Sequence, residues 1–454
     1  MLDVDGPVPR EMVVAVPSIR RDPLRYLEGV VARHGDLVAF PLPRTPALLV
    51  NSVAGARRVL VDNQRGYSKQ TVQYGALSMV TGIGLLTADG DAWRTRRRLD
   101  QPAFHHGSLD VVAEQSVAAA ERLRASWPAG GGVVDVDHAA LQATLEVVGR
   151  TLFGADLAAD GERLVGAVLA ALEVVVARAR TPVPVPSWAP TPGNRRLRRA
   201  TATLDDACAA VVRRRRSAGV ADGDTDLLAL LLRAADADEL DEQQVRDELV
   251  TMVIAGHETV ASSLTWTLHL LATHLPEQQR LHDELDEVLA GREPAWADLG
   301  SLPWTRAVVD ESLRLYPPAW VLTRRAVADD VVDGVAVPAG SLLVVSPWLL
   351  HRRADVYPDP LRFSPSRFAA DAGRVLPRGA YVPFGAGSRL CIGRDFALVE
   401  SVLVIAALLR DHAVEPVPGH RVEVDALVTL RPRGGLPLRL RPRRAGRAGR
   451  GPRG

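Results

Sequence analysis

The sequence predicts a mainly α-helical protein with a smaller β-rich region, built as a single large domain. Residues 110–290 are rich in Ala, Leu, Val and Arg and contain few helix breakers. After Pro317 the chain changes to short apolar runs, turns and proline-rich segments, followed by one more apolar stretch. No internal repeat and no linker separates these parts, so one core fits better than several independent modules.

The elements expected along the chain begin with residues 1–22, which prolines interrupt and which we expect to be irregular. The main domain is predicted over residues 23–440. It starts with a helix over 24–34 and a two-strand hairpin over 36–51, where apolar residues alternate. Residues 441–454 are basic, with Pro and Gly interleaved, which predicts a disordered tail.

Further elements are expected inside the main domain. Helices over 160–179 and 194–217 flank a proline-rich segment, 181–194, whose stiffness would suit a lid. A helix over 245–274 would be about 45 Å long at 1.5 Å per residue, enough to cross the whole core. Residues 420–440 are expected to close the chain as a hairpin with a Gly-Gly turn.

Composition and charge limit the classes of protein. A hydrophobic fraction of 47% with 24% charged residues is ordinary for a globular protein with a large core. The net charge of +1 argues against a nucleic-acid binder. Cys208 and Cys391 cannot build a disulfide framework, and the sequence shows neither a charged-then-apolar leader nor a run of 18 uncharged apolar residues. We therefore expect a soluble, cytoplasmic protein without a membrane span.

The most informative segment is the cysteine loop, Phe384–Gly393, which reads Phe-Gly-Ala-Gly-Ser-Arg-Leu-Cys-Ile-Gly. Its cysteine, Cys391, directly precedes an apolar-periodic stretch over 392–412. A thiol at the N-terminus of a helix lies among unpaired N–H groups and the positive end of the helix dipole. The sequence therefore predicts a thiolate at this position.

The residues around this cysteine suit a large planar ligand. Gly385 and Gly387 permit backbone angles that other residues resist, and they leave room for a flat, bulky group. Phe384 supplies an aromatic face, and Arg389 supplies a cation two residues before the sulfur. A thiolate, a flat apolar surface and a cation for a carboxylate together describe a haem site with cysteine as the axial ligand.

The middle of the long helix carries a second group of candidates, Ala255–Thr259, which reads Ala-Gly-His-Glu-Thr. Glycine inside a helix costs about 1 kcal/mol relative to alanine, so Gly256 requires a reason. Ala255 and Thr259 lie one turn apart. A groove beside them, flanked by the Glu258 carboxylate, could hold dioxygen and deliver protons to it. The alternative is a helix kink at which Thr259 bonds back to a carbonyl group.

Two smaller sets of side chains become informative once a haem site is expected. Glu311 and Arg314 are three residues apart on one helix face, and Arg367 could complete a buried network with them. We interpret this network as structural support for the cysteine loop. Trp93 and Arg97 share another helix face, and their N–H donors suit a propionate carboxylate. Taken alone, either set could be solvated surface.

Together these pieces resemble the cytochrome P-450 family of haem-thiolate monooxygenases, of the soluble bacterial type, over about residues 22–440. The resemblance implies the cytochrome P-450 fold around a buried haem b, with Cys391 as the axial iron ligand and O2 as co-substrate. It also implies that Glu258 and Thr259 are an acid–alcohol pair that delivers protons. The remaining cofactor contacts that it implies are Trp93, Arg97, Ala255, Gly256, Arg324, Phe384, Arg389 and Gly393.

The resemblance also implies an external source of electrons. The sequence contains no flavin-type extension, and with Cys391 committed to haem, Cys208 alone cannot ligate an iron–sulfur cluster. We therefore expect a separate ferredoxin and ferredoxin reductase, through which NAD(P)H acts indirectly. Lysine is nearly absent, so docking would use arginines on the side of the cysteine loop.

The segments that line the distal pocket in members of this family are apolar here, which predicts an apolar small-molecule substrate. The predicted pocket residues are Val72, Tyr74, Leu77, Met79, Met252, Trp320 and Val321. The run Trp320–Ala326 is similar to bacterial terpene-oxidising members, so we hypothesise a terpenoid; a fatty acid or a polyketide is the alternative. A peroxygenase, isomerase or dehydratase would typically dispense with the acid–alcohol pair, so its presence favours monooxygenation of a C–H or C=C bond.

Overall fold

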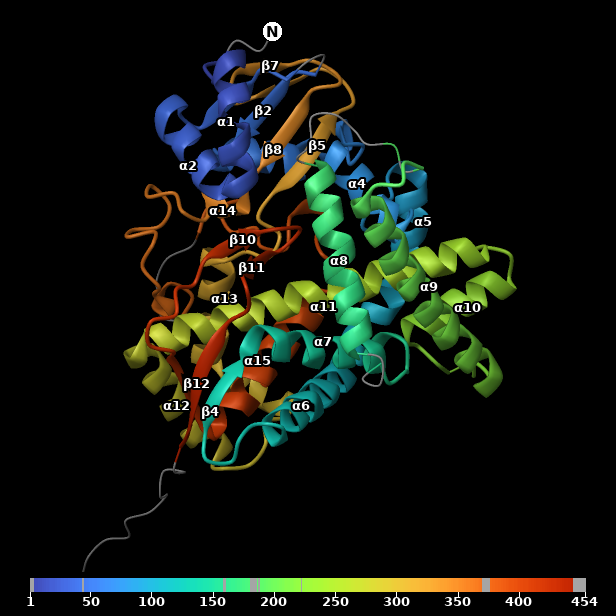
Figure 1. The fold of residues 1–454 in the computed structure, drawn as a ribbon, viewed down its shortest axis with the longest axis vertical. Coiled ribbons are helices and arrows are strands. Elements are labelled where there is room, and N and C mark those ends of the chain that lie inside the picture. Colours follow the sequence, from blue (N-terminus) through green and yellow to red (C-terminus); the bar gives the residue numbers. More distant parts are fainter. Residues whose placement is uncertain are drawn as a thin grey trace, which may run out of the picture.

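The chain is organised around one long helix, α11 (Glu242–Thr273), which crosses the middle of the molecule (Figure 1). The computed structural model describes residues 4–42, 45–157, 161–179, 186, 188–221, 223–369 and 376–443. Helices surround α11, and the largest sheet lies at one end of the molecule beside the N-terminal helices (Figure 1). This arrangement confirms the predicted mainly α fold with a smaller β-rich region.

The described helices and strands have the following bounds. The other α-helices are α1 (Pro9–Arg21), α2 (Pro23–His34), α3 (Val53–Arg57), α4 (Val72–Thr81), α5 (Gly90–Asp100), α6 (Leu109–Ala125), α7 (Val136–Leu152), α8 (Gly161–Ala179), α9 (Pro192–Ala218), α10 (Leu227–Asp236), α12 (Leu275–Leu289), α13 (Pro303–Leu315), α14 (Pro347–Leu350) and α15 (Arg394–Arg410). The strands are β1 (Leu37–Phe40), β2 (Ala47–Val50), β3 (Tyr67–Ser68), β4 (Gly132–Asp135), β5 (Leu322–Ala326), β6 (Asp330–Val332), β7 (Val335–Val337), β8 (Leu342–Val345), β9 (His412–Pro416), β10 (Val424–Ala426), β11 (Leu430–Pro432) and β12 (Pro437–Pro442).

Local sequence explains where α11 begins. The Asp241 carboxylate accepts from the Gln244 N–H at 2.7 Å, and the Gln244 side-chain oxygen accepts from the Asp241 N–H at 2.9 Å. This capping box satisfies two backbone donors at the helix start. The helix has 32 residues, and at 1.5 Å per residue it is roughly 48 Å long. The helix predicted over 245–274 is confirmed, although it begins at residue 242.

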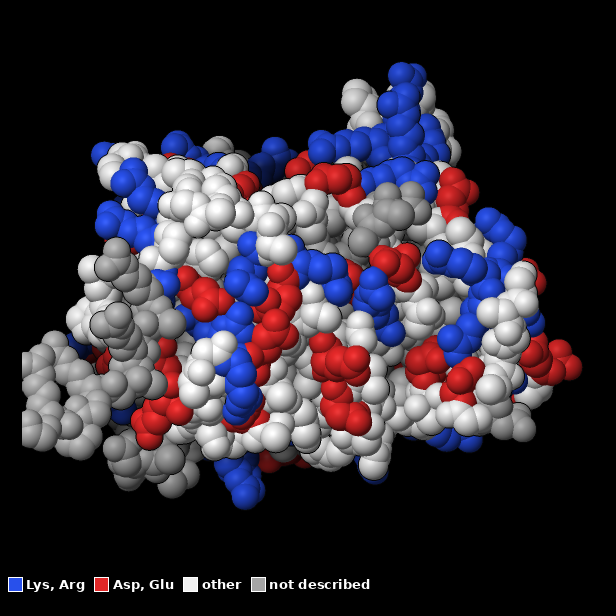
Figure 2. Space-filling model, turned by 90° about the horizontal axis from the view of Figure 1, so that it is seen from below, with Lys and Arg blue, Asp and Glu red and all other residues white. Residues whose placement is uncertain are grey.

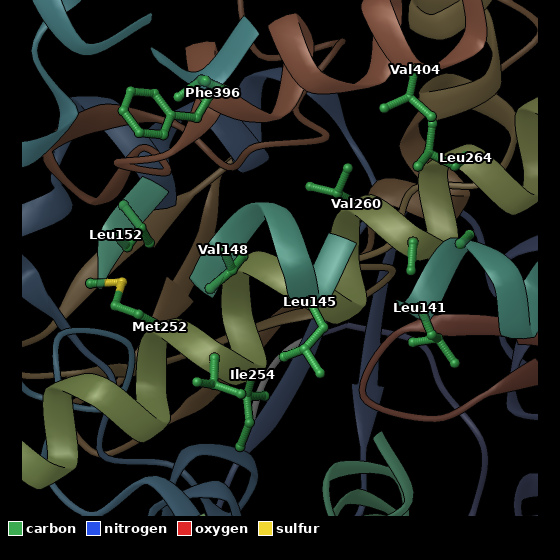
Figure 3. Packing of buried hydrophobic residues seen from close by; sticks show 14 of the residues in the cluster. Leu141, Leu145, Val148, Leu152, Met252, Ile254, Val260, Leu264, Phe396 and Val404 are labelled. Carbon is green, nitrogen blue, oxygen red and sulfur yellow. The ribbon is translucent and has the colours of Figure 1, made fainter. Parts of the chain in front are cut away.

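The centre of the core lies where α11 packs against α7 and α15 (Figure 3). α7 contributes Leu141, Leu145, Val148 and Leu152, and α11 contributes Met252, Ile254, Val260 and Leu264. Gly256 permits this approach, because a Cβ there would lie 2.9 Å from Val148 Cγ2. The glycine inside the helix therefore has a packing reason in addition to the predicted groove.

The strands form several small sheets. The largest has the order β1-β2-β8-β5-β3, in which β2 and β8 are parallel and the other neighbours are antiparallel. Because β1 pairs with β2 in register from Leu37 opposite Val50, the hairpin predicted over 36–51 is confirmed. A three-stranded sheet has the order β4-β12-β9, and β6-β7 and β10-β11 form separate pairs.

The prediction that residues 1–22 are irregular is wrong, because α1 occupies most of this segment. Pro9 is the first residue of the helix, a position where its missing N–H is not needed and its restricted φ is favourable. The Val8 N–H donates to the Glu11 carboxylate at 3.0 Å, which satisfies another donor at the helix start. The proline here marks the start of a helix rather than its absence. The helix predicted over 24–34 is confirmed as α2.

The predicted C-terminal hairpin is wrong about which strands the Gly-Gly turn connects. β10 pairs with β11 inside the predicted range, but the Gly-Gly turn does not join paired strands. Gly434 and Gly435 have φ angles of 79° and 87° and lead the chain out of the β10–β11 pair. β12 then pairs with β4 and β9. A local turn signal cannot report a strand partner that lies far away in the sequence.

Two predicted segments fall partly outside the described residues. The predicted tail over 441–454 is ordered at its start, because β12 continues to Pro442 and the Arg443 guanidinium pairs with Asp286 at 2.8 Å. Residues 444–454 lie outside the described part of the chain. The helices that flank the predicted lid are confirmed as α8 and α9, whereas residues 180–185 and 187 of the segment between them are not described.

Charged side chains of both signs are interspersed over most of the face shown in Figure 2, and a group of Lys and Arg side chains gathers at its upper right. Within the described ranges, no helix is long and apolar enough to cross a membrane.

Candidate active site

A cavity of about 310 Å³ lies beside the middle of α11. Its walls come from α4, α5, α7, α11, β5, the cysteine loop and α15. Cys391, Glu258 and Thr259 all line this cavity, together with Ala255 and Gly256. The tertiary structure therefore brings the two main groups of predicted residues to one site.

Backbone geometry in the cysteine loop presents Cys391 to the cavity. Gly385 and Gly387 both have a φ angle of 70°, which favours glycine. A Cβ on Gly387 would also lie 2.2 Å from the Leu60 carbonyl oxygen. The Cys391 N–H donates to the Phe384 carbonyl at 3.0 Å and closes the loop. Protein surrounds the Cys391 thiol, and its exposed surface faces the cavity.

The electrostatics of this thiol differ from the sequence-based expectation. Burial raises the pKa of Cys391 above its usual value, and the Gly393 N–H, Arg97, Lys69 and Arg394 lower it only in part. α15 begins at Arg394, so the thiol precedes the helix instead of lying in its first turn. Protein groups alone therefore do not favour the thiolate. A metal cation on the sulfur would, because coordination deprotonates a thiol.

Two of the arginines predicted to bind haem carboxylates keep donors available at the cavity wall. Arg97 Nη1 donates to the Leu390 carbonyl at 3.2 Å, and Arg324 Nη1 donates to the Thr323 carbonyl at 2.8 Å. A guanidinium has five N–H donors, so several remain on each side chain. Both residues line the cavity, Arg97 from α5 and Arg324 from β5.

The third predicted arginine, Arg389, is held by its neighbours. Its guanidinium lies 3.8 Å from the centre of the Trp93 ring and forms an ion pair with the Asp89 carboxylate. Arg389 Nη1 also donates to the Ala88 carbonyl at 3.1 Å. Trp93 also lines the cavity. Its ring positions Arg389 by stacking, a role that its sequence position did not indicate.

Sequence reasoning missed Lys69, the only lysine of the chain. Its ammonium group is buried at the cavity wall, donates to the Leu86 carbonyl at 2.9 Å and lies 5.0 Å from the centre of the Tyr74 ring. Burial, with contributions from Arg324 and Arg389, lowers the pKa of Lys69 well below its usual value. One lysine in a chain that otherwise uses arginine was a signal that could have marked this position.

The charge of these side chains indicates whether haem fits the cavity. Lys69 and the three arginines line one cavity, and Asp89 is the carboxylate that pairs with Arg389 beside it. Buried charges of one sign are unfavourable unless anions offset them, and two propionate carboxylates would do so. The Cys391 sulfur faces the same cavity. The residues present therefore fit haem b with a cysteine ligand.

The predicted oxygen groove shows features of both interpretations of its sequence. Ala255 and Thr259 lie one turn apart on α11 and line the cavity. The Thr259 hydroxyl donates to the Ala255 carbonyl at 2.7 Å, which is the back-bond of the alternative interpretation. α11 nevertheless continues through this turn as one helix. The site thus has a back-bonded threonine whose side chain also reaches the cavity wall.

Glu258 is fully buried at the same wall. Burial raises the pKa of its carboxyl to about 7, although Arg431 and the Thr429 hydroxyl lower it in part. Arg431 Nη1 lies 3.9 Å from Glu258 Oε1, while the same guanidinium forms a closer ion pair with Asp137. Because Glu258 is buried and shares Arg431 with Asp137, its carboxyl can hold a proton near neutral pH. Sequence reasoning missed both Arg431 and Asp137.

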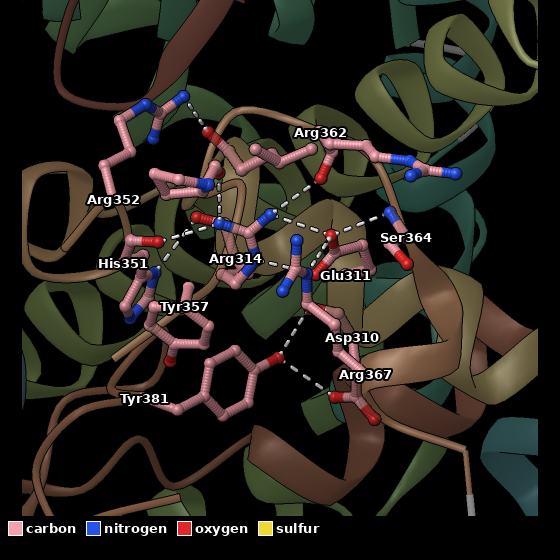
Figure 4. Close-up of polar contacts among 12 residues, drawn as sticks. Asp310, Glu311, Arg314, His351, Arg352, Tyr357, Arg362, Ser364, Arg367 and Tyr381 are labelled. Carbon is pink, nitrogen blue, oxygen red and sulfur yellow. Dashed lines mark hydrogen bonds and ion pairs between the residues drawn. The ribbon is translucent and has the colours of Figure 1, made fainter. Parts of the chain in front are cut away.

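The predicted network of Glu311, Arg314 and Arg367 is present (Figure 4). Arg314 Nε donates to Glu311 Oε2 at 2.6 Å, and its Nη2 donates to Glu311 Oε1 at 2.7 Å. Arg367 Nε lies 3.4 Å from Glu311 Oε1. Glu311 and Arg314 are completely buried, so this set is not a solvated surface pair.

Arg314 also connects α13 to the chain that leads into the cysteine loop. It donates to the carbonyls of His351 at 2.8 Å, Pro360 at 2.7 Å and Arg362 at 3.2 Å. With Glu311, these contacts use all five of its N–H donors. His351 Nε2 in turn accepts from the Val382 N–H at 2.9 Å, two residues before the cysteine loop.

The predicted substrate pocket needs correction. Tyr74, Leu77, Met252 and Val321 line the cavity, whereas Val72, Met79 and Trp320 do not. Val72 is 65% exposed on the outer side of α4. The Trp320 indole N–H donates to the Leu427 carbonyl at 2.9 Å, so this side chain is committed elsewhere. Tyr74 and Leu77 share one face of α4, and helical spacing places Val72 and Met79 off that face.

A buried acid lies at the end of α5, the helix that carries Trp93 and Arg97. Asp100 is fully buried, and neither carboxylate oxygen has a hydrogen-bond partner among the described residues. Arg96 pairs with Glu248 at 3.0 Å. Burial and the Glu248 carboxylate raise the pKa of Asp100 to about 8. We therefore expect the folded protein to hold a proton on Asp100 at neutral pH.

We expect Asp100→Asn to stabilise the protein at about pH 8 and to change little at about pH 4. The unfolded carboxyl loses its proton near pH 4, so at higher pH the folded wild type binds one more proton and loses up to about 1.4 kcal/mol per pH unit. Urea unfolding across this range would measure the slope. Asp91→Asn, on the same helix with a side chain 92% exposed, is the matched control. An unchanged slope in Asp100→Asn would contradict the assignment.

Comparisons with known proteins show the family of this chain. Residues 4–434 match the family model for cytochrome P450. The chain is 38% identical over 414 residues to cyclooctat-9-en-7-ol 5-monooxygenase of Streptomyces melanosporofaciens, covering 88% of this chain and 87% of that relative. It is 34% identical over 437 residues to pentalenene oxygenase of Streptomyces avermitilis, covering 94% and 95%.

The fold comparison leads to the same family. The crystal structure of CYP175A1 from Thermus thermophilus matches with a TM-score of 0.78 and 33% sequence identity, covering 96% of this chain and 100% of that chain. The chain therefore belongs to the cytochrome P450 family of haem-thiolate monooxygenases.

Proposed function

We propose that this enzyme inserts one oxygen atom from O2 into a C–H or C=C bond of a terpenoid. The observation that carries the proposal is one largely apolar cavity that holds the Cys391 sulfur together with Glu258 and Thr259. Leu77 and Met252 are among its apolar lining residues. The similarity to cyclooctat-9-en-7-ol 5-monooxygenase and pentalenene oxygenase supports a terpenoid as the substrate class.

Haem, when bound, supplies a thiolate-ligated iron that activates dioxygen. Cys391 would be its ligand, and Arg97, Arg324 and Arg389 would hold its carboxylates through charge-assisted hydrogen bonds. Apolar side chains of α4, α11 and β5 would orient the substrate and keep water away from the reacting bond. The protein's share of the chemistry is therefore binding, orientation and the control of protons.

Glu258 and Thr259 would control the protons. A carboxyl with a pKa of about 7 both holds and releases a proton at neutral pH, which suits general acid–base catalysis. Thr259 now donates its hydroxyl proton to the Ala255 carbonyl, so rotation about χ1 would release that proton for the cavity. Arg431, held by Asp137, would stabilise Glu258 when its proton has left.

Electrons would come from a separate ferredoxin and an NAD(P)H-dependent ferredoxin reductase. Cys208 is buried in α9. The described residues contain no group of three or more His, Cys, Asp or Glu side chains that could hold a metal ion. Arg306 and Arg394 are partly exposed on a groove that includes Phe384 and Leu390 of the cysteine loop. These arginines would attract an acidic partner protein.

We expect Thr259→Ala to reduce the product formed per NAD(P)H by about 10-fold or more, since positioned proton transfer typically contributes at least 10²-fold. NAD(P)H consumption should continue, with the electrons recovered as reduced oxygen species. Measuring NAD(P)H, product and hydrogen peroxide together would show this uncoupling. Thr273→Ala is the matched control, because Thr273 makes the same back-bond at the far end of α11. Unchanged coupling in Thr259→Ala would refute the proton role.

Titration of the ferric holoprotein with a sesquiterpene hydrocarbon is expected to shift the haem Soret band from low spin to high spin. An apolar ligand in the cavity would exclude water from the haem. A long-chain fatty acid is the comparison ligand, and it should cause a smaller shift. A shift with the fatty acid and none with the terpene would contradict the terpenoid proposal and indicate a lipid substrate.

A further inference from the structure

One polar side chain at the substrate wall has no role in the function proposed above. Gln73, on α4, lies between Val72 and Tyr74 and lines the cavity. It is the one carboxamide among the described residues of the cavity wall. Leu77, from the next turn of α4, and Val321 are apolar members of the same wall. Gln73 is partly buried, so a hydrogen-bond partner in the cavity would stabilise its amide.

A chain of hydroxyl groups determines which end of this amide is available. The Thr323 hydroxyl donates to Gln73 Oε1 at 2.8 Å, and the Thr71 and Thr323 hydroxyl oxygens are 2.8 Å apart. Each hydroxyl has a single hydrogen to donate. Since Thr323 uses its hydrogen for Gln73, Thr71 must donate to Thr323, and both hydrogens are then bonded.

The reversed orientation of the amide is disfavoured. If Gln73 Nε2 donated to Thr323, the Thr323 hydrogen would go to Thr71, whose own hydrogen would have no acceptor among the described residues. Thr71 is buried, and an unsatisfied buried donor costs about 1–3 kcal/mol. The carbonyl end of the amide is therefore the end that faces Thr323.

This orientation leaves both N–H donors of Gln73 Nε2 without a partner among the described residues. Thr323, which holds the carbonyl end, does not line the cavity, although its neighbours Leu322 and Arg324 do. The amide nitrogen of Gln73 is therefore available to donate to a ligand in the cavity. The Thr151 hydroxyl, another polar group of the wall, is already committed to the Val147 carbonyl at 2.7 Å.

We propose that Gln73 donates a hydrogen bond to an oxygen atom that the substrate already carries, so that this enzyme acts on a terpenoid alcohol or ketone. The proposal rests on the function proposed above and narrows its substrate class. A hydrocarbon would leave the amide nitrogen unpaired, whereas a hydroxyl or carbonyl oxygen would pair it. The reaction that supplies the substrate must then be an earlier oxygenation, or a cyclisation that ends in the capture of water.

Binding of matched ligands to the ferric holoprotein tests this proposal. Cedrene and cedrol, and santalene and santalol, are two pairs in which hydrocarbon and alcohol share a carbon skeleton. The wild type should bind the alcohol about 3- to 10-fold more tightly than the hydrocarbon in at least one pair, as one net hydrogen bond predicts. Dissociation constants would come from Soret titration and, independently, from equilibrium dialysis.

Variants separate Gln73 from its neighbours. Gln73→Leu should remove the preference for the alcohol while hydrocarbon binding remains, and Thr323→Val should weaken the preference because the amide is no longer oriented. Thr251→Val is the matched control. Its hydroxyl lacks a partner and it also lines the cavity, but its Oγ1 is turned toward Gly84, where a Cβ would lie 2.1 Å away.

The outcomes distinguish the two proposals. Equal binding of hydrocarbon and alcohol by the wild type, or an unchanged preference in Gln73→Leu, would overturn the role of Gln73 and leave the terpenoid proposal standing. Loss of the preference in Thr251→Val instead of Gln73→Leu would also overturn it. Binding of a fatty acid with no binding of any terpenoid would overturn the proposed function itself, and with it this inference.

Discussion

Replacement of Cys391 with alanine is expected to reduce oxygenation to the background of the assay. The thiolate supplies the electron density that favours cleavage of the O–O bond, and no other side chain can replace it. Cys208 lies buried in the helical core, where burial raises the pKa of its thiol to about 12. Haem carboxylates could still meet Arg97 and Arg324, so some haem should remain bound without thiolate ligation.

Spectroscopy separates loss of the ligand from loss of the protein. The ratio of Soret to protein absorbance would report haem content, and the carbon monoxide difference spectrum of the reduced protein would report thiolate ligation. Cys208→Ala is the matched control and should keep both signals, with a loss of stability of about 1 kcal/mol for the buried volume. A thiolate spectrum that persists in Cys391→Ala would contradict the assignment of the ligand.

Replacement of Arg314 with methionine is expected to lower the free energy of unfolding by about 3–5 kcal/mol, because it removes the bidentate partner of the buried Glu311 carboxylate and leaves only the more distant Arg367 guanidinium beside it. The variant also leaves three carbonyls without their donor, those of His351, Pro360 and Arg362. Since His351 holds Val382 ahead of the cysteine loop, haem binding should weaken together with stability.

Thermal unfolding and haem retention of the holoprotein would measure this effect. Arg306→Met is the matched control on the same helix, because the Arg306 side chain is 48% exposed and pairs with Asp310 one turn away. The Asp310 side chain is only 14% exposed, but the Arg306 guanidinium is open to water, so its loss should cost about 1 kcal/mol or less. If Arg314→Met and Arg306→Met lost the same small amount of stability, the network would not support the cysteine loop.

The parts of the site that could be predicted have local signals. The cysteine loop contains the predicted ligand, two glycines with positive φ and a cation within ten residues. Ala255 and Thr259 lie one turn apart on the same helix. The contact of Glu311 with Arg314 follows from helical spacing. Apolar residues that continue over many turns, together with a capping box, indicate the long helix α11.

The parts that could not be predicted depend on contacts between distant segments. Lys69 meets the cavity from a short segment before α4, and Arg431 reaches Glu258 from β11 near the end of the described chain. Asp137, at the start of α7, is the residue that competes for Arg431. Nothing in the local pattern of any of these residues reports its partner.

The sequence by itself determined the helical fold, the cysteine ligand and the class of chemistry, because periodicity and short motifs act through steric and hydrogen-bonding effects between near neighbours in the chain. Only the tertiary structure decided which cations converge on the cavity, which face of α4 meets the substrate and why Glu258 keeps a proton near neutral pH. Burial and electrostatic interaction depend on distance in space, and the fold sets that distance between residues such as Glu258 and Arg431.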